Sequence, residues 1–193
     1  MKKNFLFCIV FFGLAAFSHA DVIKQSYSFA NPKIESSDGF QRLQFEGLLQ
    51  TGISGEPPLP YQSVSLLVPP GHSATGIHIT TGEEVVLEGF YRIFPMQHSQ
   101  PVSKGGSGIF ALKEDVYSKN ATYPDQINGE VVTHFMNGFG VAMTTFTPVN
   151  YNPATGRLSY FKEITISIET KADAKAVEAL RNLNTSEAVI QRL

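Results

Sequence analysis

After residue 20, apolar side chains alternate with polar ones over most of the sequence, and this period of two restricts the chain mainly to β-strands. The pattern is clearest where isoleucine occupies positions 164, 166 and 168 with polar residues between them. Turn-forming Gly, Pro and Asn bound each run, and about eight to ten strands at such short spacing are typical of a sandwich. We therefore expect an all-β, antiparallel β-sandwich-like domain with strands within residues 22–30, 40–50, 62–68, 74–82, 83–95, 130–149 and 157–170.

Five prolines surround the strand expected at residues 62–68, in the stretch 54–71. Such a stretch could be a polyproline ligand or the beginning of a buried strand. Three prolines precede the strand and two follow it, so none removes an N–H donor from its middle. Val64, Leu66 and Val68 would then point to one side, and we interpret the prolines as the boundaries of a core strand.

The first 20 residues have the parts of a secretory signal peptide. Two lysines precede an apolar run from Phe5 to Phe17, and small residues lie near a cut after Ala20. The apolar run is too short to span a bilayer comfortably, which argues against an uncleaved membrane anchor. We expect export to the periplasm, the cell surface or the extracellular space, without stable membrane insertion after cleavage.

Removal of residues 1–20 would limit the chemistry of the remaining chain. The single cysteine, Cys8, would be lost, and with it any disulfide, thiolate nucleophile or cysteine metal ligand. Two basic and no acidic residues would be lost, which leaves 13 basic and 17 acidic side chains and a formal charge of −4. An acidic domain without a basic cluster is a poor candidate for binding nucleic acid.

The sequence offers no recognisable catalytic, metal or cofactor site. It lacks a G-x-S-x-G nucleophile motif, a phosphate loop and a dinucleotide fingerprint. His72, His78, His98 and His134 are scattered rather than paired at metal-ligand spacing. We therefore expect a non-catalytic domain, with no catalytic residue, no metal and no cofactor, whose function lies in a binding surface.

Two segments depart from the strand pattern. Residues 97–128 form a long, polar, Gly-rich connection whose expected tip is Ser103–Gly108, and a loop of this length is usually functional or disordered. The C-terminal residues are rich in Ala, Glu and Lys, with Ala176, Leu180 and Leu183 at helical spacing. The expected organisation is a signal peptide (1–20), an all-β domain (21–170) and a helical connector or tail (171–193).

Two proline-containing motifs lie beside the expected strands. The first, G-x-P-x-L-P, comprises Gly55, Pro57, Leu59 and Pro60. The second, P-x-x-Y-N-P-x-T-x-x-L, is a hairpin leading into the isoleucine-rich strand and comprises Pro148, Tyr151, Asn152, Pro153, Thr155 and Leu158. With these motifs in this order behind a signal peptide, residues 22–170 resemble the propeptide of gingipain-type cysteine peptidases.

The resemblance implies an all-β prodomain that assists folding of a peptidase domain, in cis or in trans, and blocks its active site until cleavage. In characterised members of that family, a basic side chain on a prodomain loop occupies the pocket that reads arginine or lysine. The segment Phe135–Val141, close to where we would look for that residue, contains no Arg or Lys. The candidates for a peptidase-facing loop are therefore Lys104 and Lys119, unless coverage of the cleft alone inhibits. Arg181 and Arg192 are candidate processing sites.

Two alternatives stay open at the level of sequence. The chain could be a truncated precursor or a free-standing relative of the prodomain, and in either form it would lack peptidase activity itself. A different class of function, a surface adhesin or carbohydrate-binding β-sandwich, would need an exposed aromatic platform. The possible members of such a platform are Tyr91, Phe94, Tyr117 and Tyr123.

Overall fold

The computed structural model describes residues 21–50, 52–98, 103 and 109–192. The predicted signal peptide and Lys104 therefore lie outside the described residues. Antiparallel strands dominate, and the helices are short and mostly C-terminal, which confirms the all-β prediction with a helical tail. The strands are β1 (Asp21–Ser28), β2 (Lys33–Ser37), β3 (Phe40–Gln44), β4 (Leu49–Gln50), β5 (Pro60–Leu67), β6 (His72–Thr81), β7 (Glu84–Leu87), β8 (Val132–Met136), β9 (Phe139–Phe146), β10 (Val149–Asn152), β11 (Arg157–Phe161) and β12 (Glu163–Ala172). The helices are α1 (Glu114–Tyr117), α2 (Ala174–Ala179), the 3₁₀ helix η2 (Leu180–Asn182) and α3 (Glu187–Ile190).

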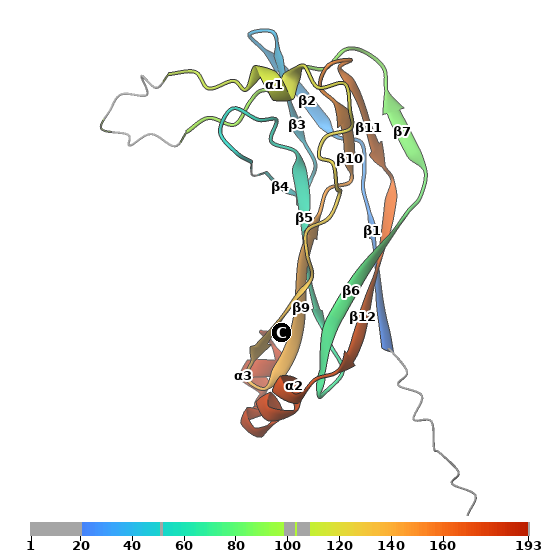
Figure 1. The fold of residues 1–193 in the computed structure, drawn as a ribbon, viewed down its shortest axis with the longest axis vertical. Helices are drawn as coiled ribbons and strands as arrows, with labels where there is room; N and C mark the ends of the chain where they lie inside the picture. Colours follow the sequence, from blue (N-terminus) through green and yellow to red (C-terminus); the bar gives the residue numbers. More distant parts are fainter. Residues whose placement is uncertain (1–20, 51, 99–102, 104–108, 193) are drawn as a thin grey trace, which may run out of the picture.

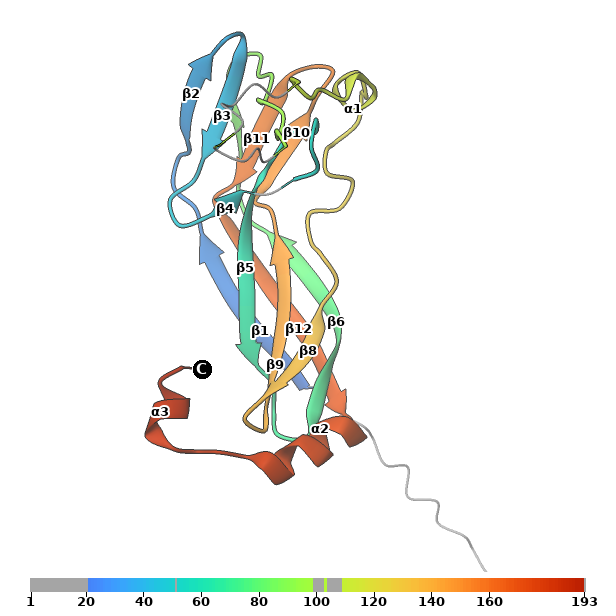
Figure 2. The same cartoon turned by 90° about the vertical axis from the view of Figure 1, so that its left-hand side faces the viewer.

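The molecule is elongated, and its sheets are distributed along the long axis (Figure 1). At one end, the sheet β10–β11–β7 lies beside the hairpin β2–β3 and α1. Towards the other end, the sheet β1–β12–β6 lies behind β5, β9 and β8 of the sheet β4–β5–β9–β8 (Figure 2). Helices α2 and α3 lie at this second end, far from α1.

The two sheets at the second end pack face to face as a sandwich. Alternate residues of β5 and β9 point inward, among them Val64 and Phe146, each 1% exposed. They meet the three isoleucines of β12, which are 0% exposed. The inward alternation in these strands is the pattern that the sequence predicts, and the sandwich-like architecture is confirmed.

A second apolar cluster fills the end that carries α1. It is built around Tyr151 and Tyr160, with Leu43, Phe45, Ile93, Val149 and Leu158 also buried. Phe29, directly after β1, joins this cluster to the sandwich core, because its ring centroid lies 6.4 Å from that of Phe45 and 6.0 Å from that of Phe146. The apolar interior is therefore continuous along the molecule.

The proline-rich stretch contains a buried strand, as predicted. Val64 and Val68 are buried and Leu66 is half-buried against the sandwich core. Pro60 is the first residue of β5, a position where proline removes no central ladder bond.

The expected strand at 83–95 is mostly wrong. Only Glu84–Leu87 forms strand β7, because the chain leaves the sheet at Gly89, whose φ is +126°. Similarly, the run at 40–50 divides into β3 and the two-residue β4.

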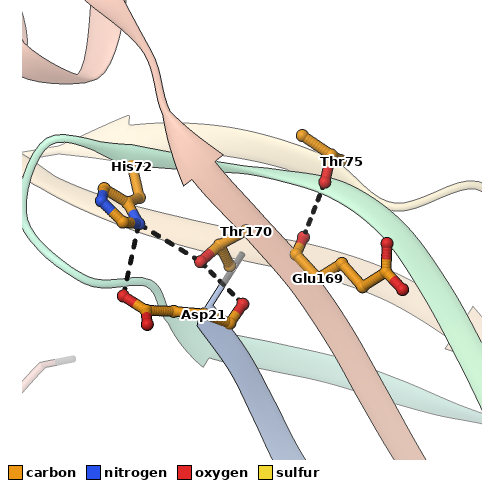
Figure 3. A network of polar contacts seen from close by, with 5 residues as sticks. All are labelled: Asp21, His72, Thr75, Glu169 and Thr170. Carbon is orange, nitrogen blue, oxygen red and sulfur yellow. Dashed lines mark hydrogen bonds and ion pairs between the residues drawn. The ribbon is translucent and has the colours of Figure 1, made fainter. Parts of the chain in front are cut away.

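Strand β1 begins at Asp21, the first residue after the predicted signal cut, and pairs with β12 along its whole length. The hydroxyl of Thr170 donates to the Asp21 carbonyl oxygen at 3.0 Å (Figure 3). Nδ1 of His72 lies 3.4 Å from the Thr170 hydroxyl and 3.7 Å from Oδ2 of Asp21. These contacts hold the beginning of β1 to β12 and, through His72, to the beginning of β6.

The C-terminal tail packs on the β8–β9 hairpin. Asp173 caps α2 by accepting from the Lys175 N–H at 3.1 Å, and it accepts from the Ser73 hydroxyl at 2.7 Å. Further along, the Asn184 N–H donates to the Asn137 carbonyl oxygen at 3.0 Å. Ala176, Leu180 and Leu183 face the hairpin together, lining a small cavity with Val68 and Phe139. No helix within the described ranges has the length and apolar character needed to cross a bilayer.

Candidate functional site

The longest connection in the described chain runs from β7 to β8 and carries α1. It crosses the end of the molecule opposite the helical tail (Figure 1). A connection of this length can present a stable shape only if side chains fix it to the sheets.

Gln97 joins the two roots of the segment 98–110. Its Nε2 donates to the Pro95 carbonyl oxygen at 2.9 Å and to the Ala111 carbonyl oxygen at 3.0 Å. Its Oε1 accepts from the Ala111 N–H at 2.9 Å. The segment therefore leaves and returns to the body of the protein at a single place, which we call the loop base (Gln97 and Ala111).

The first sequence motif supports the loop base through Gly55. Its N–H donates to the Met96 carbonyl oxygen at 2.7 Å, and its own carbonyl oxygen accepts from the Lys113 N–H at 2.9 Å. Its φ is +86°, and a Cβ added there would lie 3.0 Å from Cγ and 3.2 Å from N of Lys113. Both the backbone conformation and the close approach therefore require glycine at this position.

Glu56, the next residue, binds two side chains of the connection. Its Oε1 lies 2.7 Å from Lys113 Nζ, and its Oε2 accepts from the Tyr123 hydroxyl at 3.0 Å. The Glu56 side chain is only 14% exposed, so both interactions are partly shielded from water. Burial, and then the hydrogen bond to this carboxylate, raises the pKa of Tyr123.

The second sequence motif holds the connection from the other side. The Tyr151 hydroxyl donates to the Tyr91 carbonyl oxygen at 3.0 Å, and the Tyr151 backbone pairs with that of Tyr123. The Asn152 side chain donates to Oδ1 of Asn120 at 3.0 Å and accepts from the Thr155 N–H at 3.2 Å. The two motifs, nearly a hundred residues apart, thus support the same connection.

Helix α1 is fixed by Tyr117. The side chain is buried, and its hydroxyl donates to the Ile93 carbonyl oxygen at 2.5 Å. Burial raises the pKa of Tyr117. Because its hydroxyl is hydrogen-bonded, the Tyr117 side chain can be buried without leaving an unpaired polar group, and it holds α1 against the body of the protein.

The predicted site residues lie far from one another. Lys119 is exposed just after α1, and its Nζ lies 3.0 Å from Oδ1 of Asp125. Arg181, in η2, and Arg192, after α3, are exposed at the opposite end of the molecule (Figure 1). In the part of the chain that the structure describes, no group of three or more His, Cys, Asp or Glu is placed to hold a metal ion.

The four aromatic residues considered for a carbohydrate platform do not form one. Tyr117 is buried, and Tyr91 and Tyr123 are half-buried with their hydroxyls bound to Glu88 and Glu56. Phe94 is half-buried and packs against Phe40. Sequence reasoning did not find the roles of Glu56 and Gln97, because their partners lie elsewhere in the sequence and no local pattern marks them.

Comparison with solved structures shows the same fold. One match comes from work on the zymogenic latency of gingipain K from Porphyromonas gingivalis, with a TM-score of 0.64 and 21% identity, covering 82% of this chain and 90% of that one. Another is the complex of the pro- and mature domains of RgpB from Porphyromonas gingivalis, with a TM-score of 0.61 and 19% identity, covering 79% and 80% of the two chains. No curated protein matches the sequence significantly.

A protein-family model connects the fold to an identity. The model of Propeptide_C25, the gingipain propeptide, matches residues 18–190. This match covers both sequence motifs, every strand and most of the helical tail. It indicates a non-catalytic propeptide rather than the peptidase. The chain therefore belongs to the Propeptide_C25 family, as the sequence motifs predict.

Proposed function

We propose that this propeptide binds a gingipain-type cysteine peptidase domain and keeps it latent by placing the connection between β7 and β8 over the active site. The observation that carries the proposal is the loop base, where two hydrogen bonds join Gln97 to Ala111 and a third joins Gln97 to the Pro95 carbonyl oxygen. A segment that is fixed at both roots loses less conformational entropy on binding than a free one. The similar structures, which concern zymogenic latency and a complex of pro- and mature domains, support the same role.

Of the two lysines, we propose Lys104 as the side chain that reaches the peptidase. Lys104 belongs to the segment between the two joined roots. Lys119 lies outside that segment, and its ammonium group already pairs with Asp125 at 3.0 Å. An exposed pair of this kind is weak, but Lys119 would have to leave Asp125 in order to reach a partner protein.

The proposal is tested with the chain from Asp21 onward and the gingipain-type peptidase domain encoded in the same genome. Peptide hydrolysis should fall with rising propeptide concentration, and the two proteins should elute as one complex. Lys104→Ala should weaken inhibition at least tenfold, while Lys119→Ala should change it less than threefold, the level expected for an exposed ion pair. Unchanged hydrolysis at micromolar propeptide, with no complex on the column, would sink the proposed function.

We also propose that the propeptide assists folding of that peptidase domain. A preformed β surface can bury complementary apolar surface of a partner before the partner is fully ordered. Refolding the denatured peptidase domain with and without the propeptide tests this role. The expected result is a higher yield of active peptidase, measured after the propeptide has been removed.

We also propose two proteolytic cleavages of the chain. The first follows Ala20 on export, and the second follows Arg181 or Arg192 on maturation. The supporting observations are that residues 1–20 have the parts of a signal peptide and that both arginines are exposed. N-terminal sequencing of the exported and the matured products should give Asp21 and a residue directly after one of these arginines.

A further inference from the structure

Three phenylalanines and two arginines form a cluster on the surface beside the loop base, which we call the Phe–Arg cluster (Phe40, Phe94, Phe110, Arg42 and Arg92). The ring centroids of Phe40, Phe94 and Phe110 lie 5.7, 5.8 and 5.9 Å apart. The Arg42 guanidinium lies 3.8 Å from the centroid of Phe94, and that of Arg92 lies 5.1 Å from the centroid of Phe40. Two of the ring pairs are T-shaped and the Phe40–Phe110 pair is tilted, and the arginine distances are typical of cation–π contacts.

The cluster exposes more apolar surface than the fold requires. Phe110 is 50% exposed, and the preceding residue, Ile109, is 95% exposed. Aromatic residues and arginine are enriched in protein–protein interfaces, where a few of them supply most of the binding energy. A cluster with this composition is therefore suited to bind another protein.

Arg42 has no carboxylate partner within the part of the chain that the structure describes. Glu35 is its neighbour across the β2–β3 hairpin, but the Glu35 carboxylate lies 2.6 Å from the Lys33 ammonium group instead. Arg92 is 3.9 Å from Glu114, at the limit of an ion pair. The guanidinium of Arg42, held over the Phe94 ring, can therefore donate hydrogen bonds to a carboxylate of a partner.

The position of the cluster places it beside the loop base, where the proposed function puts the peptidase. Phe94 lies three residues before Gln97, and Phe110 lies directly before Ala111, so two of the three rings belong to the roots of the loop base. Any protein whose cleft receives this loop must also meet the side chains at its roots.

We propose that the Phe–Arg cluster is the docking surface for the rim of the peptidase cleft, and that this rim offers an apolar side chain flanked by a carboxylate. This inference rests on the proposed function and adds the place and chemistry of the contact. The cluster would then contribute affinity, while the loop itself excludes substrate from the cleft.

The test measures the dissociation constant between the chain from Asp21 onward and the peptidase domain, by titration calorimetry. Phe110→Ala should raise the dissociation constant about 30-fold, the effect of losing one dominant interface residue. Arg42→Glu should raise it about as much, and the effect should shrink at high salt, whereas Arg42→Lys should keep part of the affinity. The matched control is Phe90→Ala. Phe90 is 64% exposed, but its ring lies beside Gly156 in the turn between β10 and β11 and forms no ring pair with the described aromatic residues.

The outcomes separate this inference from the proposed function. If the unaltered chain neither binds nor inhibits the peptidase, the proposed function itself is wrong. If the unaltered chain inhibits and Phe110→Ala and Arg42→Glu bind as tightly as Phe90→Ala does, only the Phe–Arg cluster is excluded. Thermal unfolding of each variant shows whether a lost affinity reflects a lost fold, and Arg42→Glu, an exposed substitution, should unfold within a few degrees of the unaltered chain.

Discussion

The ammonium group of Lys113 lies 2.7 Å from Oε1 of Glu56, a residue 57 positions earlier in the chain. The other carboxylate oxygen of Glu56 binds the Tyr123 hydroxyl, so one half-buried side chain holds two points of the long connection. We expect Glu56→Ala to lower the free energy of unfolding by about 1–3 kcal/mol, because it leaves both partners without their acceptor. Chemical denaturation measures the change.

The control for this variant is Glu46→Ala. Glu46 is exposed and makes no side-chain hydrogen bond or ion pair with the described residues. Its replacement should change the free energy of unfolding by less than about 0.5 kcal/mol. Equal effects of the two variants would show that Glu56 does not stabilise the connection.

Gly55 and Gly47 have similar φ values but different surroundings, so alanine substitutions at the two positions test how closely Lys113 approaches Gly55. Gly55 and Gly47 have φ values of +86° and +74°, but a Cβ at Gly47 would meet nothing within 4 Å. Alanine at either position carries the cost of a left-handed backbone, about 1 kcal/mol. We expect Gly55→Ala to destabilise the protein more than Gly47→Ala, because only the former displaces Lys113. Similar melting temperatures for the two variants would contradict this contact.

The tail offers a second comparison of the same design. A Cβ at Gly138, whose φ is +85°, would lie 2.5 Å from Cα of Leu183, whereas at Gly39, with φ of +79°, it would meet nothing within 4 Å. We expect Gly138→Ala to push the tail from the β8–β9 hairpin and to speed hydrogen exchange at the Asn184 amide. Gly39→Ala should leave that amide protected, and equal protection in both variants would refute the close packing.

We expect alkaline pH to destabilise the connection between β7 and β8 at a lower pH than it destabilises the β-sandwich. The pKa values of Tyr117 and Tyr123 are raised above 10.0 in the folded protein, mainly by burial. A raised folded-state pKa contributes stability that is complete below pH 10 and is lost as the pH rises above it. We expect unfolding to begin above pH 10 and the tyrosinate absorbance of these residues to appear together with it. Tyr117→Phe and Tyr123→Phe should each remove part of that pH dependence.

The sequence predicts the sandwich well because its strands alternate strictly. The isoleucines of β12 and Val64 in β5 are buried as their spacing requires, and the hairpin between β10 and β11 is correctly located. The expected strand at 83–95 failed because β-forming residues such as Tyr91 and Ile93 serve there as anchors outside a regular sheet. The alternation of apolar and polar residues predicts local backbone conformation only. The conformation of Tyr91 and Ile93 depends instead on partners that are distant in the sequence.

The candidate site shows the same limit. The G-x-P-x-L-P motif could be recognised from its letters, but the need for glycine at position 55 arises from Lys113, which approaches it only after folding. The Phe–Arg cluster likewise joins β3 to both roots of the loop base, and no single stretch of the sequence contains it. Long-range contacts of this kind require coordinates.

The pairing of β1 with β12 joins the first strand of the domain to the last. Asp21 pairs with Thr170, and Ser28 with Glu163, so the first strand finds its partner only in the last one. Until the ribosome has released residues 163–172, β1 has nothing to pair with, and β6 lacks the same partner. Such non-local topology favours slow folding after synthesis rather than during it. The sheet β1–β12–β6 can therefore form only after the two ends of the β domain have met.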